Sequence, residues 1–182
     1  VLLNDSQAYR QNQPETITTT NQIVSSSTVR VTDPVADLAM INPTAGASSG
    51  NAGDTVQVSW TVRNQGTATA GVTPIEEWAN IWRDQVYISD DAVWDQNDKA
   101  VTITTQMNGN SVAIRQPLGA AAEYTRTETI RLPARAGSYL IFKTDGQQTQ
   151  PEASETNNAV AIPFTLSFTP PDLQVTAAQV TS

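Results

Sequence analysis

Thr55-Val56-Gln57-Val58-Ser59-Trp60-Thr61-Val62-Arg63 is the stretch that decides the fold. Apolar residues occupy every second position of this run, which is the two-residue period of a strand with one buried face. Burying each of these side chains stabilises the fold by about 1.5–3 kcal/mol before the cost of ordering the chain. The run therefore predicts a central β-strand, ended by the turn sequence Asn64-Gln65-Gly66-Thr67.

The rest of the chain shows the same alternation and no sustained helical period. The run 158–168 places apolar residues on one face, and its Pro163 lacks a backbone donor, which predicts a sheet edge or a bulge there. Weaker strand-like runs cover 37–41, 84–89, 99–105, 111–115, 124–132 and 138–144. Seven or eight short strands without a crossover helix predict an all-β fold, an Ig-like antiparallel β-sandwich.

Two segments fit this pattern poorly. In 124–132, Arg126 and Glu128 share a face with apolar residues, so either a bulge shifts the register or the two side chains pair at the rim. The segment 72–82 is long for a loop and rich in apolar residues. We expect it to form a short helical turn that caps one end of the sandwich, or else a platform on which a ligand stacks.

A weak internal repeat in the sequence indicates a tandem array of similar domains. Six residues recur in the same order about 135 positions later, namely Pro14, Glu15, Thr20, Asn21, Asp37 and Leu38 as Pro151, Glu152, Thr156, Asn157, Asp172 and Leu173. Repeats of this length fit one domain each. We therefore interpret 1–33 as the tail of an upstream repeat, 36–168 as a complete β-sandwich, and 171–182 as the first strand of a following repeat.

Composition excludes several classes of function. The 182 residues include no Cys and no His, which removes disulfides, thiolate or imidazole metal sites, and Cys or His catalytic pairs. The formal net charge of −8 and the lack of a basic cluster argue against nucleic-acid binding. No run reaches the roughly 18 apolar residues of a membrane span, so no membrane insertion is expected in this fragment.

Two acidic segments are candidates for binding a metal ion. Calcium accepts six to eight oxygen ligands from carboxylates, Asn amides and backbone carbonyls, and both segments supply such oxygens. The candidate ligands are Asp90, Asp91, Asp95, Asn97 and Asp98 in the first segment, and Asp145, Glu152, Glu155, Asn157 and Asn158 in the second.

Each acidic segment also has a reading without metal. The first would be a solvated loop of Asx turns, and in the second Asn157 and Asn158 would satisfy backbone groups where the last strand begins. In an Ig-like topology the first segment lies at the end where the chain exits and the second near the end where it enters. We hypothesise that calcium, if bound, stiffens the junction between successive repeats.

Several motifs resemble the opening and the end of the CARDB module, the cell-adhesion-related domain found in bacteria. They are Ala36-Asp37-Leu38, Gly53 to Gly66 with its Trp60 strand, Asp84 to Asp91, Gly137-Ser138-Tyr139, and Glu152 to Asn158. The chain departs from the usual pattern in longer segments at 72–82 and 108–118 and in Glu128, where an apolar residue is normal. The resemblance implies an Ig-like sandwich, tandem repetition and an extracellular or cell-surface location, and it implies no reaction.

We therefore expect a non-catalytic structural or adhesion repeat whose partners are neighbouring repeats of the same chain and a surface protein or glycan. A carbohydrate-binding sandwich is the alternative, because Trp78, Trp82 and Trp94 could stack on sugar rings if they are exposed. An enzyme is disfavoured. Glu76 and Glu77 are adjacent, so their side chains point apart, and no activated nucleophile accompanies them.

Overall fold

The computed structural model describes residues 33–71, 81–106, 109–114, 116–174 and 176, and residues 34–182 form one compact unit. All regular elements in this described part are strands. They are β1 (Leu38–Ala45), β2 (Ser49–Asn51), β3 (Thr55–Asn64), β4 (Trp82–Ser89), β5 (Lys99–Ala100), β6 (Thr102–Ile103), β7 (Val112–Ile114), β8 (Glu123–Arg131), β9 (Gly137–Lys143) and β10 (Ala159–Ser167). The described residues contain no helix with the length and hydropathy of a membrane span.

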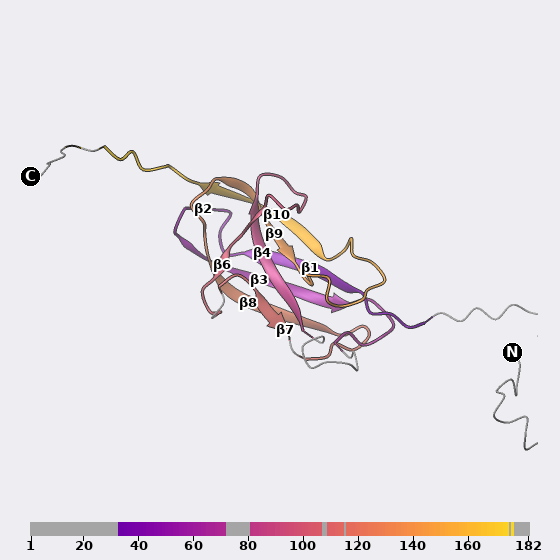
Figure 1. Cartoon of the computed structure of the whole chain (residues 1–182). Helices are drawn as coiled ribbons and strands as arrows, with labels where there is room; N and C mark the ends of the chain where they lie inside the picture. The colour runs from indigo at the N-terminus through magenta and orange to yellow at the C-terminus, as the bar shows by residue number, and fades with distance from the viewer. Residues whose placement is uncertain (1–32, 72–80, 107–108, 115, 175, 177–182) are drawn as a thin grey trace, which may run out of the picture. The chain divides into compact units, whose positions relative to one another are not determined.

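The strands form two sheets packed face to face (Figure 1). One sheet has the order β1-β3-β8-β6, and the other has the order β2-β10-β9-β4-β5, with β7 paired to β4. Neighbouring strands are antiparallel except for β2 and β10, which run parallel. This is the strand order of an immunoglobulin-like sandwich, so the predicted fold class is confirmed.

Ten strands appear where the sequence predicts seven or eight, for two reasons. The short β2 carries no alternation that would reveal it. The single strand predicted at 99–105 is two strands in different sheets, because β5 pairs with β4 whereas β6 pairs with β8. The chain crosses between the sheets at Val101, whose side chain is fully buried.

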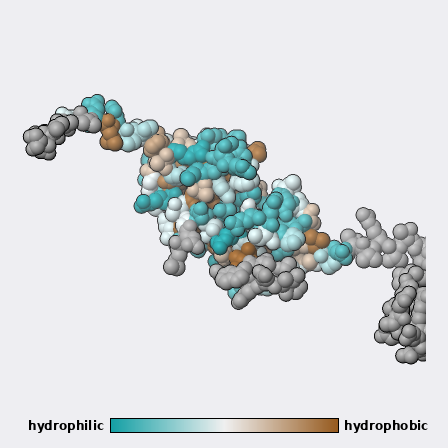
Figure 2. Space-filling model, in the orientation of Figure 1, coloured by the Kyte–Doolittle hydropathy of each residue, from teal (hydrophilic) through white to brown (hydrophobic). Residues whose placement is uncertain are grey.

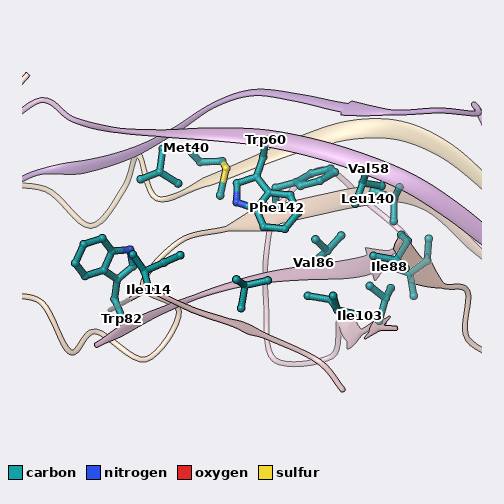
Figure 3. Close-up of a cluster of buried hydrophobic side chains, with 14 of the residues drawn as sticks. Met40, Val58, Trp60, Trp82, Val86, Ile88, Ile103, Ile114, Leu140 and Phe142 are labelled. Atoms are coloured by element: carbon teal, nitrogen blue, oxygen red, sulfur yellow. The ribbon is translucent and has the colours of Figure 1, made fainter. Parts of the chain in front are cut away.

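The core lies between the two sheets and follows the alternation of β3. Val56, Val58, Trp60 and Val62 all point inward and are at most 7% exposed. Figure 3 shows Trp60 beside Phe142 of β9, and their ring centroids are 6.0 Å apart. The strand β3 is central, as predicted, because it pairs with β1 on one side and β8 on the other.

The structure tests the predictions for two irregular strands, β10 and β8. The pairing of β10 with β9 shifts register between Pro163 and Leu166, so the predicted bulge at Pro163 is confirmed. In β8 both readings were wrong: its pairing with β3 is regular from end to end, and Arg126 is exposed. Glu128 points inward at 9% exposure and accepts a hydrogen bond from the hydroxyl of Thr105. A hydroxyl partner lets this buried carboxylate replace an apolar residue.

The surface is mostly polar. Figure 2 shows a face that is largely hydrophilic with small, scattered apolar areas. Among the described residues, Val93 and Leu173 are the large hydrophobic side chains that remain exposed. On the face that Figure 2 shows, the described residues form no contiguous apolar patch of the size that marks a permanent protein interface.

Several predictions fall on residues outside the described ranges. Most of the segment 72–82 is among them, so neither a helical turn nor a platform is tested there. Its last residue is described, and Trp82 begins β4 with its side chain 1% exposed. The interpretation of 1–33 and 171–182 as parts of neighbouring repeats stays a prediction.

Candidate functional site

The two acidic segments lie at opposite ends of the sandwich. The segment 90–98 follows Ser89, which pairs with Tyr139, next to the end where β10 finishes opposite Gly137. We call this segment the exit-end loop. The residues Asp145–Asn158 connect Lys143 of β9 to Ala159 of β10, beside the start of β1. We call these residues, together with Asp37, the entry-end cluster.

The exit-end loop is closed by its own carboxylates. The carboxylates of Asp91, Asp95 and Asp98 each accept a hydrogen bond from a backbone amide of the loop, at 2.7–2.9 Å. Asp90 forms an ion pair with Arg135 at 3.0 Å, and its side chain is 78% exposed. The bonds of Asp91 and Asp95, each from the amide two residues further on, are the Asx turns of the reading without metal. Each carboxylate keeps further lone pairs, so calcium in this loop stays a prediction.

Trp94 attaches the exit-end loop to the outer face of the second sheet. Its ring packs edge-on against Tyr87 of β4, with centroids 6.0 Å apart. The Lys143 ammonium lies 3.2 Å from the centroid of the Trp94 ring, a cation–π contact. Burial lowers the pKa of Lys143. Trp94 is therefore half-buried and occupied by protein partners.

The two described tryptophans of the carbohydrate alternative, Trp82 and Trp94, both pack against protein groups. The carbohydrate alternative requires an exposed Trp82, but Trp82 lies in the core and donates to the Tyr124 hydroxyl at 3.1 Å. Its apolar ring and the polar partner at its nitrogen together explain this burial. Trp78 lies outside the described residues, as do Glu76 and Glu77.

At the entry end, Asp145 shapes the connection from β9 to β10. Asp145 is fully buried and has a positive φ of 39°, which Asp tolerates better than most residues. Its carboxylate accepts hydrogen bonds from the Thr149 amide and hydroxyl and from the Gln150 amide, at 2.8–3.0 Å. All of these partners are local, so Asp145 has a structural role in holding the turn.

Glu152 joins this connection to the first strand. One oxygen, Oε2, accepts a hydrogen bond from the Leu38 amide at 2.7 Å, whereas Oε1 is buried without a hydrogen-bond partner. Burial raises the pKa of Glu152 to about 8, opposed by the Leu38 bond and reinforced by the negative charges of Glu155, Asp145 and Asp37. Glu152 is thus a carboxyl group with one unused oxygen in negative surroundings.

The two asparagines bond to carboxylates, so the expectation that they cap the backbone was wrong. The Asn157 amide donates to Asp37 at 2.9 Å, and the Asn158 amide donates to Glu155 at 3.1 Å. Their side-chain oxygens are buried and have no hydrogen-bond partner. The structure therefore brings the predicted residues of the second segment together and adds Asp37. The recurring Asp-Leu pair was the signal that could have identified Asp37.

Whether these groups hold a metal depends on asparagine as well as carboxylate oxygens. Within the described ranges, no three Asp, Glu, His or Cys side chains form a group that could hold a metal ion by themselves. A calcium site also takes Asn and backbone oxygens and water, which such a grouping does not count. Calcium at either end stays a prediction at this point.

A buried polar network lies between the two sheets. The sequence did not predict it. Asp84 of β4 is fully buried and accepts hydrogen bonds from the Trp60 indole, the Tyr124 hydroxyl and the Thr144 hydroxyl, each at 2.8 Å. Burial raises the pKa of Asp84 to about 6, and these hydrogen bonds oppose the rise. The network links the two sheets, and both carboxylate oxygens are used within it.

A comparison with protein families identifies the family of this chain. The sequence profile of one family, CARDB, matches residues 35–162. The chain belongs to the CARDB family. No curated protein matches the chain.

Among solved structures, this CARDB chain is similar to the CARDB domain of the PF1109 protein from Pyrococcus furiosus. The crystal structure of that domain, in complex with di-metal ions, is 16% identical over 76% of this chain and 95% of the other, with a TM-score of 0.49. A solution structure of the same domain is 15% identical over 73% and 94% of the two chains, with a TM-score of 0.42. A β-glucosidase from Erythrobacter marinus is 13% identical over 72% of this chain and 16% of its own, with a TM-score of 0.40.

Proposed function

We propose that this CARDB domain is a non-catalytic, load-bearing adhesion module of a large cell-surface or secreted protein. In this proposal it is one unit in a string of similar domains, and calcium stiffens its junctions. Its partners are the neighbouring repeats and a surface protein or glycan. Family membership and the acidic composition support this role, but one structural observation carries it: the way the first and last strands are held.

The chain enters and leaves the sandwich at opposite ends (Figure 1). The entering segment is held at the entry end, where Ala36 bridges to Glu152. The last strand ends at the exit end, where β10 pairs in parallel with β2 through Thr165–Ser167 and Ser49–Asn51. Tension on the two ends would pull β1 and β2 toward the entry end and β10 toward the exit end.

This arrangement resists tension well. The hydrogen bonds between strands are roughly perpendicular to the strand axes. Sliding β10 along β2 and β9 therefore loads many of these bonds at once. Peeling β10 from one end would break them one after another. A domain whose terminal strands must slide suits a chain that transmits force between a cell surface and its partner.

Support for a non-catalytic role comes from the use of the buried carboxylate. Asp84 has the raised pKa that often marks an active site. However, its oxygens accept hydrogen bonds from three side chains inside the core, and it is 0% exposed. A group in this position bonds the two sheets together and has no access to substrate.

Single-molecule force spectroscopy tests the proposal. The chain has no cysteine, so introduced pairs provide unique attachment points. Asp33→Cys with Thr169→Cys applies force across the two ends, whereas Gln96→Cys with Thr169→Cys applies it at the exit end and peels β10. We expect a clearly higher unfolding force for the first pair. Equal forces for the two pairs would refute the load-bearing role, and turnover of polysaccharides or peptides by the chain would refute the non-catalytic one.

A further inference from the structure

Three oxygen atoms at the entry end are removed from water without gaining a hydrogen bond. They are Glu152 Oε1, Asn157 Oδ1 and Asn158 Oδ1. Asn158 is only 1% exposed. A buried oxygen without a partner is destabilising, and more so when it is charged, because the hydrogen bonds it made to water are not replaced. Three such atoms within seven residues of one connection indicate that something else bonds to them.

The hydrogen bonds around these atoms set their orientation. Each asparagine points its NH₂ group at a carboxylate, at Asp37 for Asn157 and at Glu155 for Asn158. These bonds use the amide nitrogens as donors, and the two Oδ1 atoms are left free to accept. Glu152 is anchored through Oε2 on the Leu38 amide, which leaves Oε1 free.

The electrostatic environment favours a cation as the missing partner. Glu152 feels the negative charges of Glu155, Asp145 and Asp37. Among the described residues, Lys143 is the positive group that acts on this cluster, on Glu155 and on Asp145. The free atoms are all oxygens, from one carboxylate and two amides, and such ligands suit a hard divalent cation. Calcium fits better than magnesium because it accepts an irregular set of oxygens, completed by backbone carbonyls and water.

We propose that the entry-end cluster binds one Ca²⁺ ion through Glu152 and the side-chain oxygens of Asn157 and Asn158. This inference rests on the proposed role as a load-bearing module and specifies where calcium acts. The ion lies where the β9–β10 connection holds the entering chain, through the Leu38 amide and through the Ala153 amide, which donates to the Ala36 carbonyl at 2.9 Å. Binding therefore fastens the segment that leads in from the upstream repeat.

Nuclear magnetic resonance on the whole 182-residue chain tests this site. The Leu38 amide donates to Glu152, so its resonance reports on the cluster. We expect CaCl₂ to shift this resonance saturably, and MgCl₂ at the same concentrations to have little effect. Glu152→Gln keeps an acceptor for Leu38 but removes the charge, and it should raise the calcium Kd at least about tenfold. Asp95→Asn, the matched change in the exit-end loop, should leave the Kd unchanged.

Each other outcome overturns the proposal. An absent or non-saturable shift would mean that water or a proton serves the three oxygens. An unchanged Kd in Glu152→Gln, or a Kd raised by Asp95→Asn, would place the ion elsewhere. Amide spectra recorded without calcium establish that both variants fold. The force measurement is made with a chelator present, so it does not depend on calcium. A failed calcium titration therefore leaves the load-bearing role intact, and equal unfolding forces leave the calcium site intact.

Discussion

The exit end and the entry end of the sandwich both carry several carboxylates, and they use them differently. In the exit-end loop, Asp91 and Asp95 are exposed, and each accepts a local backbone amide. At the entry end, Asp145 is fully buried and Glu152 holds the amide of a residue 114 positions away. The first arrangement stabilises only its own loop, whereas the second joins distant parts of the chain. Long-range contacts of this kind determine how firmly the entering segment is attached.

The largest effect should come from adding a methyl group at the entry end. A Cβ on Gly66 would lie 2.3 Å from the carbonyl oxygen of Val35 and 2.6 Å from the Asp37 nitrogen, which are backbone atoms of the entering segment. We expect Gly66→Ala to lower the free energy of unfolding by about 3 kcal/mol or more, since overpacking against backbone cannot relax easily. Denaturant titration measures this.

The matched change at the exit end is Gly137→Ala. Its Cβ would lie 2.5 Å from Cγ1 of the buried Ile88 side chain, but its nearest backbone neighbour, the Ser89 carbonyl oxygen, is 3.1 Å away, so the movement of one side chain relieves most of the overlap. A loss of about 1–2 kcal/mol is expected. If the two variants lose the same stability, the entering segment is not held more rigidly than the exit end.

The second effect is a dependence of stability on pH that arises from Asp84. Its pKa is raised from 3.8 to about 6 in the folded chain, so between these values the folded state binds more protons than the unfolded state. Stability from this group is therefore fully present below about pH 4 and is lost as pH rises through 6, by up to about 3 kcal/mol. Unfolding free energies from pH 4 to pH 7 measure the slope.

Asp84→Asn is the control for this slope. It keeps the size of the side chain and removes the titrating proton, so the decline between pH 4 and pH 6 should become shallower and leave the part that comes from Glu152. An Asn variant with the same slope as the natural chain would assign the effect to other groups, such as Glu152, whose pKa is also raised.

A smaller effect is expected at Asp145. Asp145→Ala removes the acceptor for the Thr149 and Gln150 amides and places Ala at a positive φ. The expected loss of unfolding free energy is about 2 kcal/mol. Asp91→Ala at the exit end also removes an acceptor, for the Val93 amide, but there water replaces it, and the loss should stay below about 0.5 kcal/mol. Similar losses in both variants would remove the distinction between the two ends.

The smallest effect concerns the ion pair of the exit-end loop. Arg135 lies 3.0 Å from Asp90 and also donates to the Asn97 carbonyl at 3.3 Å. Arg135→Gln should cost about 0.2–1 kcal/mol, because the pair is exposed to solvent. The loss should shrink further in high salt. Measured by thermal unfolding, a loss above 2 kcal/mol would show that the exit end is more than a local loop.

Much of the architecture could be predicted from local pattern. The alternation of β3 placed Trp60 and its neighbours in the core, and Pro163 marked a bulge. The acidic composition of both end segments was also readable. The division of 99–105 between two sheets could not be predicted. A strand that changes sheet keeps the same alternation of side chains and differs only in its hydrogen-bond partners.

The candidate site was only partly predictable for the same kind of reason. Glu152, Asn157 and Asn158 were identified by type and proximity in the sequence. Asp37 and the Leu38 amide lie at the start of β1, more than a hundred residues earlier in the chain. The burial of Asp84 depends on three donors, which come from β3, from β8 and from the residue after β9. No local sequence pattern predicts them.

The sequence by itself determined that the chain forms a two-layer β module with polar ends, because side-chain alternation has the period of the pleat and apolar burial supplies the driving force. Only the tertiary structure decided which carboxylates are satisfied and which oxygens are left free. Satisfaction of a buried group depends on atoms that lie close in space, and folding brings these together from strands distant in the chain.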